Sequence, residues 1–118
     1  MIRRIVAGFQ LRVNQAVDIT DSLLGENSPY ISNLVYDIDV RLVFIECFDN
    51  PKTQKPTIRL VFPGILTYAE TNLLDQPDDE NIDDIMSIIQ LDKQRISITT
   101  YKKEITLTLT DEPFVEKV

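Results

Sequence analysis

The sequence predicts a mostly β or α+β fold, built as a single antiparallel sheet or a small sandwich of about six strands with one or two short helices. Three observations lead to this prediction. Apolar and polar residues alternate with a period of two along much of the chain, asparagine–proline and proline–glycine pairs separate the alternating segments, and few segments have helical spacing. Because the chain has 118 residues, of which 43% are hydrophobic, we expect residues 1–118 to form a single compact domain.

The N-terminal quarter of the chain predicts a strand followed by a short helix. The apolar positions of the strand, which share one face, are Ile5, Ala7, Phe9, Leu11 and Val13. After it, Ala16, Ile19 and Leu23 recur at helical spacing, and Gly25 is a suitable C-cap. A structured loop is the alternative to this helix.

The strongest strand signal covers residues 34–48. Its even positions are apolar as far as Phe44, whereas its odd positions change from polar, as at Asp37 and Arg41, to apolar, as at Val43. We interpret this segment as one long central strand, with the short helix covering half of its second face.

A loop rich in turn-forming residues leads to the next predicted strand, residues 57–66. Ile58 and Phe62 lie on one face of this strand and Arg59 on the other. Pro63 and Gly64 end or kink it. We expect these residues to form a hairpin with the strand before them.

The last third of the chain predicts a second hairpin. Isoleucine or leucine alternates with serine or threonine on both sides of Lys102 and Lys103. A turn centred on these lysines places Ile98 opposite Leu107, and Ile96 opposite Leu109, so that the apolar faces match. We expect the threonine-rich face to be solvated and the last eight residues to fray.

The negative charge is concentrated in one place. The formal net charge is −7, and six of the 19 acidic residues lie within residues 75–84, the acidic segment: Asp75, Asp78, Asp79, Glu80, Asp83 and Asp84. Removing them leaves 13 acidic residues to face 12 lysines and arginines. Because such a chain is repelled by phosphate backbones and anionic lipids, we expect a basic protein as partner, and neither nucleic acid nor a membrane.

Three interpretations of the acidic segment are open. A calcium loop needs a glycine at its sixth position and a closing glutamate, and "DQPDDENIDD" has neither. A solvated connecting loop is the usual state of a charge run. A docking surface, with the six carboxylates as partner-binding residues, would speed encounter with a basic protein.

The residue content restricts catalytic chemistry. The chain has no histidine and one cysteine, Cys47, which excludes an internal disulfide and every histidine-dependent nucleophile. We therefore expect no enzyme, no catalytic or metal-binding residues and no cofactor, and we interpret Cys47 as a packed thiol. The alternative is a carboxylate-based enzyme or divalent-metal-binding protein that uses Asp37, Asp39 and Glu46.

Residues 34–111 resemble small bacterial immunity proteins of polymorphic toxin systems, in particular the family numbered fifty. The similar features are "YDIDV" at the start of a strand, "TIRLVFPGI" as the following strand and "NIDDIMSI" before the final hairpin. The resemblance implies a cytoplasmic protein that binds and neutralises a cognate toxin and has no catalysis of its own.

The leading hypothesis is therefore a small acidic protein-binding module, with neutralisation of a basic toxin as its most concrete form. We expect it in the cytoplasm, because no apolar run is long enough to span a bilayer and no cleavage site follows the first apolar patch. A structural subunit of a homo-oligomer, joined through the threonine-rich hairpin or an exposed strand edge, is a further alternative.

Overall fold

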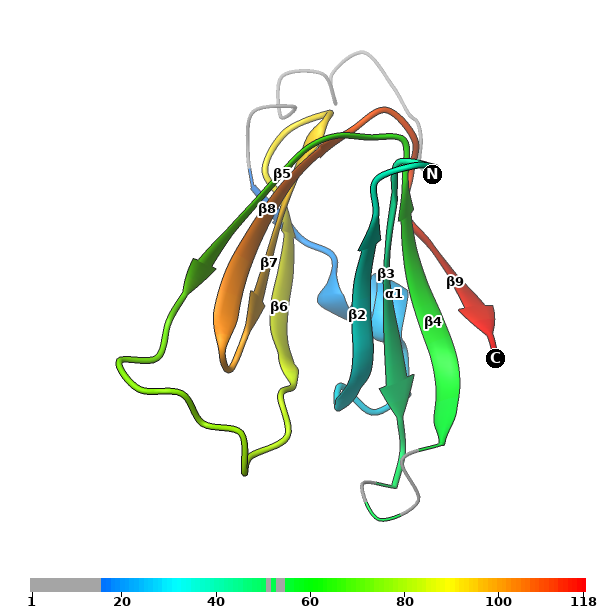
Figure 1. The fold of residues 1–118 in the computed structure, drawn as a ribbon. Coiled ribbons are helices and arrows are strands. Elements are labelled where there is room, and N and C mark those ends of the chain that lie inside the picture. The colour runs from blue at the N-terminus through cyan, green and yellow to red at the C-terminus, as the bar shows by residue number, and fades with distance from the viewer. Residues whose placement is uncertain (1–15, 51, 53–54) are drawn as a thin grey trace.

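The computed structural model describes residues 16–50, 52 and 55–118, and these residues form nine strands and one short helix (Figure 1). The strands make two antiparallel sheets that face each other across a common core. The predicted mostly β fold is thus confirmed, in its sandwich form. The predicted strand at residues 5–13 lies outside the described residues.

The first sheet has five strands, in the spatial order β1 (Val17–Asp18), β6 (Ile85–Gln90), β7 (Arg95–Thr100), β8 (Lys103–Leu109) and β5 (Ile65–Asn72). The second sheet has four, in the order β2 (Ile31–Asp37), β3 (Leu42–Phe48), β4 (Pro56–Pro63) and β9 (Phe114–Lys117). The helix α1 (Thr20–Leu24) contacts β6 and β9, so it lies at one side of the sandwich.

Period-two alternation builds the core. Along β7, and along β8 from Ile105 onward, every second residue is buried, and the residues between are at least partly exposed. The fully buried aliphatic and aromatic side chains are Val43, Ile45, Leu60 and Phe62 from one sheet and Ile65, Ile88, Ile96, Ile98, Ile105 and Leu107 from the other. Each stabilises the fold by about 1.5–3 kcal/mol relative to an exposed position.

The prediction of one long strand over residues 34–48 is wrong, because a tight turn divides it into β2 and β3. The Asp37 carboxylate accepts the backbone N–H groups of Asp39 and Val40, at 3.1 and 3.4 Å, and Arg41 has a positive φ of 53°. Leu34 then pairs with Ile45, so the even positions of β2 and the odd positions of β3 share the core face. The change from polar to apolar at the odd positions therefore marked the turn.

The predicted helix is present but short. It begins at Thr20 rather than near Ala16, and its C-cap is Gly25, as predicted, with φ 58° and its N–H donated to the Asp21 carbonyl at 2.8 Å. The helix packs beside β6 and β9 and does not cover β3, so that part of the prediction is wrong.

Pro63 and Gly64 end β4, as predicted, and pass the chain to the other sheet. Gly64 has φ 68°, and its carbonyl accepts the Thr110 N–H at 2.9 Å. On the other side of the passage, the Ile65 N–H donates to the Arg41 carbonyl at 2.9 Å. β3 and β4 form the predicted hairpin.

The β7–β8 hairpin is present with its register shifted by two residues. Ile98 pairs with Ile105, and Ile96 pairs with Leu107. The turn consists of Tyr101 and Lys102, one residue earlier than predicted, and the Thr100 hydroxyl accepts the N–H groups of Lys102 and Lys103 at 3.2 and 3.0 Å. A shift by two preserves the parity of each strand, so the apolar faces still match.

Two smaller predictions about the C-terminal third also need correction. The last residues do not fray, since β9 pairs with β4. The threonine-rich face is solvated only in part, because Thr106 and Thr108 are half-buried while Thr110 is exposed.

Cys47 is fully buried on β3, as predicted, and burial raises the pKa of its thiol to about 12.

We expect a disulfide reagent at mild alkaline pH to modify the Cys47 thiol of the folded protein about two orders of magnitude more slowly than that of the denatured protein, because the thiol is reached only when the fold opens. Stability should fall as pH rises from 9 to about 12, where only the unfolded state loses this proton. Equal modification rates in native buffer and denaturant would show that the fold does not protect the thiol.

Candidate interaction surface

The acidic segment belongs to the connection that joins β5 to β6, at the lower left of Figure 1. This connection passes the β7–β8 turn and is bonded to it at both ends. The Leu73 N–H donates to the Lys102 carbonyl at 2.9 Å, and the Tyr101 N–H donates to the Asp84 carbonyl at 3.0 Å. The turn therefore serves as a support against which the segment is held.

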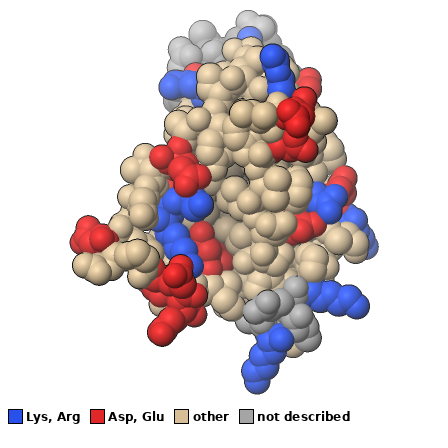
Figure 2. Space-filling model, viewed as in Figure 1, with Lys and Arg blue, Asp and Glu red and all other residues tan. Residues whose placement is uncertain are grey.

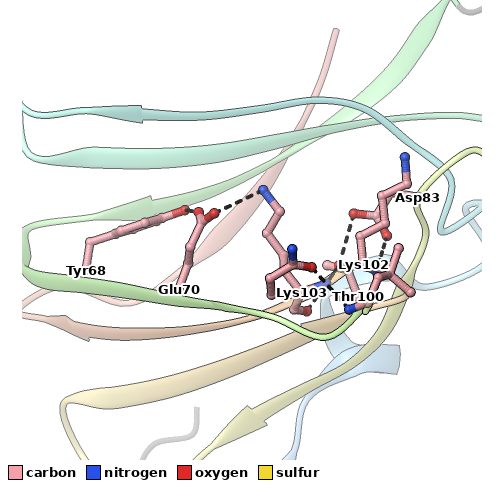
Figure 3. A network of polar contacts seen from close by, with 8 residues as sticks. Tyr68, Glu70, Asp83, Thr100, Lys102 and Lys103 are labelled. Carbon is pink, nitrogen blue, oxygen red and sulfur yellow. Dashed lines mark hydrogen bonds and ion pairs between the residues drawn. The ribbon is translucent and has the colours of Figure 1, made fainter. Parts of the chain in front are cut away.

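Asp83 fixes one end of the segment through its carboxylate (Figure 3). One oxygen accepts the hydroxyl of the fully buried Thr100 at 3.0 Å. The other oxygen accepts the backbone N–H groups of Lys102 and Asp84, both at 3.0 Å. The Asp83 carboxylate is therefore committed to the β7–β8 turn, which gives this residue a structural role.

Asp78 shapes the middle of the segment. Its carboxylate accepts the backbone N–H of Asn81 at 3.2 Å, the Asn81 side-chain amide at 2.6 Å and the Tyr101 hydroxyl at 3.3 Å. These bonds, above all the one from the Asn81 side chain, lower the pKa of Asp78. Two carboxylates of the segment, those of Asp78 and Asp83, therefore bind it to Asn81 and to the β7–β8 turn.

The remaining acids of the segment differ in their exposure. Asp75, Asp79 and Glu80 are exposed, whereas Asp84 is half-buried. Within the described part of the chain, none of the ion pairs involves any of the six acids. Figure 2 shows Asp and Glu side chains gathered at the lower left around a smaller group of basic side chains. The segment is therefore an exposed negative surface.

A cleft of about 400 Å³ lies between the acidic segment and the four-stranded sheet. Ile31 and Phe48 contribute apolar surface, and Asp79, Glu80 and Lys102 contribute charged groups. The acidic segment thus forms one wall of a groove as well as an outer surface.

A second polar network lies on the adjoining strands (Figure 3). The Tyr68 hydroxyl donates to Glu70 at 2.6 Å, Glu70 pairs with Lys103 at 3.5 Å, and the Tyr68 ring stacks on Tyr36 with centroids 4.7 Å apart. The hydrogen bond from Tyr68, followed by the Lys103 charge, lowers the pKa of Glu70. Sequence reasoning missed this network, because only the spacing of Tyr68 and Glu70 on one strand face was visible before the pairing of β5 with β8 was known.

The structure does not bring Glu46 together with Asp37, as the alternative of a carboxylate-based enzyme or metal site would require. Asp37 binds the β2–β3 turn, while Glu46 lies four residues beyond the start of β3, about 13 Å along the strand. Glu46 is 14% exposed and pairs with Arg59 at 2.6 Å, and the guanidinium lies over the Phe44 ring at 4.9 Å. Over the described residues, no group of three or more His, Cys, Asp or Glu side chains is placed to hold a metal ion.

Comparison with known proteins adds no relative. No family model matches the chain, and no curated protein or solved structure is significantly similar to it. Within the described ranges, no helix is long and apolar enough to cross a membrane.

Proposed function

We propose that this protein is a protein-binding module whose acidic segment docks against a basic surface of a partner. The observation that carries the proposal is the exposure of Asp75, Asp79 and Glu80 in a segment that forms no ion pair with the described residues. Exposed carboxylates that form no ion pair create a local field that accelerates encounter with an oppositely charged protein.

The anchoring of the segment supports docking over a merely solvated loop. Asp78 and Asp83 bind Asn81, Thr100 and the turn backbone, so the three exposed carboxylates are carried on a constrained loop. A pre-ordered loop loses less conformational entropy on binding than a free one.

The most specific form of the proposal comes from the sequence resemblance to immunity proteins. In that form the partner is a basic toxin, and the acidic segment covers the surface with which the toxin binds its own anionic substrate. Binding alone is then sufficient to neutralise the toxin, and no catalysis by this protein is needed.

The test compares two charge-matched triple variants as baits for capture from a lysate at low salt. D75N/D79N/E80Q removes the exposed charge of the acidic segment, and E26Q/D39N/E112Q removes three exposed charges elsewhere. For a protein retained by the wild type, we expect the first variant to lower the association rate about tenfold or more at about 20 mM salt and little at about 500 mM salt. The second variant should have a much smaller effect.

Stopped-flow measurement with the purified partner gives these rates. Equal association rates for the two variants would remove the acidic segment from the mechanism, because they differ in the position of the lost charge and not in its amount.

A further inference from the structure

β5 is the most accessible sheet edge among the strands that the structure describes. β1 and β9 have two and four residues, and the start of β2 is occupied by the Ile31 N–H bond to the Asp83 carbonyl. β5 has eight residues, no described strand lies on its outer side, and all of them except Ile65 and Tyr68 are exposed. It also lacks the lysines and prolines that usually protect an edge from pairing.

The pairing with β8 determines which backbone groups of β5 point outward. The Leu73 N–H bond to the Lys102 carbonyl makes that pair a hydrogen-bonded one. Because hydrogen-bonded and non-hydrogen-bonded pairs alternate in an antiparallel ladder, Tyr68, Glu70 and Asn72 direct their N–H and C=O groups away from β8, to the edge on which no described strand lies. These three residues form a row of backbone donors and acceptors that another strand can bind.

The charge around this edge selects the strand that fits it. β5 leads directly into the acidic segment, and Glu70 and Glu104 add two further carboxylates near this edge. The basic residues beside them are Lys102 and Lys103. A second copy of this chain carries the same net charge of −7, which disfavours pairing of two such edges. A strand with basic side chains gains both the backbone hydrogen bonds and the electrostatic attraction.

We propose that β5 accepts an extended, basic strand of the partner as a sixth strand of the five-stranded sheet. This inference rests on the proposed function and adds to it the form of the partner segment. The acidic segment attracts the strand, and the β5 backbone binds it in register.

The test uses a synthetic peptide of about 12 residues in which lysine alternates with valine. Two control peptides have glutamate in place of lysine, or the lysine sequence with alternate backbone nitrogens methylated. Amide hydrogen exchange of the full chain, followed by NMR, should show protection of the Tyr68, Glu70 and Asn72 amides by the lysine peptide and by neither control.

A pair of variants separates the backbone from the side chain. E70P and E70T both remove the Glu70 carboxylate, and only E70P removes the outward N–H; edge positions accept proline without losing a ladder bond. We expect E70P to bind the lysine peptide about tenfold more weakly than E70T. The exchange measurement on the unmodified chain decides the matter if E70P does not fold.

Each other result overturns the inference in its own way. Peptide binding that perturbs only the acidic segment, with equal affinities for E70P and E70T, refutes strand addition and leaves the proposed function standing. No binding of the lysine peptide also refutes strand addition, while the two charge-matched triple variants still decide the proposed function. Protection of the three edge amides in the free protein, together with a doubled mass, assigns the edge to a second copy instead.

Discussion

Replacing Gly64 by alanine is expected to destabilise the protein by about 3 kcal/mol, which combines left-handed strain and overpacking. Gly64 has φ 68°, and a Cβ at this position would overlap Thr110 Oγ1 and lie 2.9 Å from the Asp111 carboxylate. The Thr110 hydroxyl also donates to the Gly64 carbonyl at 3.4 Å, and this bond holds it close to the position that the new Cβ would occupy. Urea denaturation measures the loss as a lower midpoint at unchanged slope.

Gly25 provides a matched control for the strain alone. It also has a positive φ, 58°, but a Cβ there would meet nothing within 4 Å. We therefore expect G25A to cost only about 1 kcal/mol. Adding T110A to G64A should recover part of the loss, with an interaction energy of about 1 kcal/mol. If G64A is no more harmful than G25A, the close approach of Gly64 to Thr110 is refuted.

Replacing Asp83 by alanine is expected to destabilise the fold by about 2–3 kcal/mol, the scale of lost hydrogen bonds to a charged, partly buried group. The change removes the acceptor for the Thr100 hydroxyl and for the Lys102 and Asp84 N–H groups. The freed segment should also show faster amide exchange at residues 73–84.

Asp79 is the control for charge without anchoring. Its carboxylate is exposed and makes no hydrogen bond or ion pair with the described residues that would explain a structural role. D79A should therefore change the free energy of unfolding by less than about 0.5 kcal/mol. A similar loss for D79A and D83A in urea denaturation would show that Asp83 does not anchor the segment.

The two substitutions of the acidic segment also separate structure from binding. D83A should slow partner association through disorder of the loop as well as through the lost charge, while D79A should slow it through charge alone and keep its stability. Comparing stability and association rate for each variant therefore assigns the two roles independently.

Local pattern was sufficient to predict much of the fold. The alternation on either side of Lys102 and Lys103 predicted two paired strands and the correct core face of each, because burial of one face depends only on parity. Gly25 and the Pro63 and Gly64 pair were recognised as a helix end and a strand end, because a positive φ or a missing N–H acts within a few residues. The position of six acids in one segment also follows from the sequence alone.

Only the tertiary structure decided how these elements meet. The division of residues 34–48 depended on the hydrogen bonds of Asp37 to a turn, and a strand-like apolar pattern continues through Ile38 and Val40 although both are exposed. The different roles of Asp83 and Asp79 depend on Thr100, which is 17 residues from Asp83 along the chain. Such contacts arise from strand pairing and loop closure, whose free energy depends on distant partners and is not expressed in local periodicity.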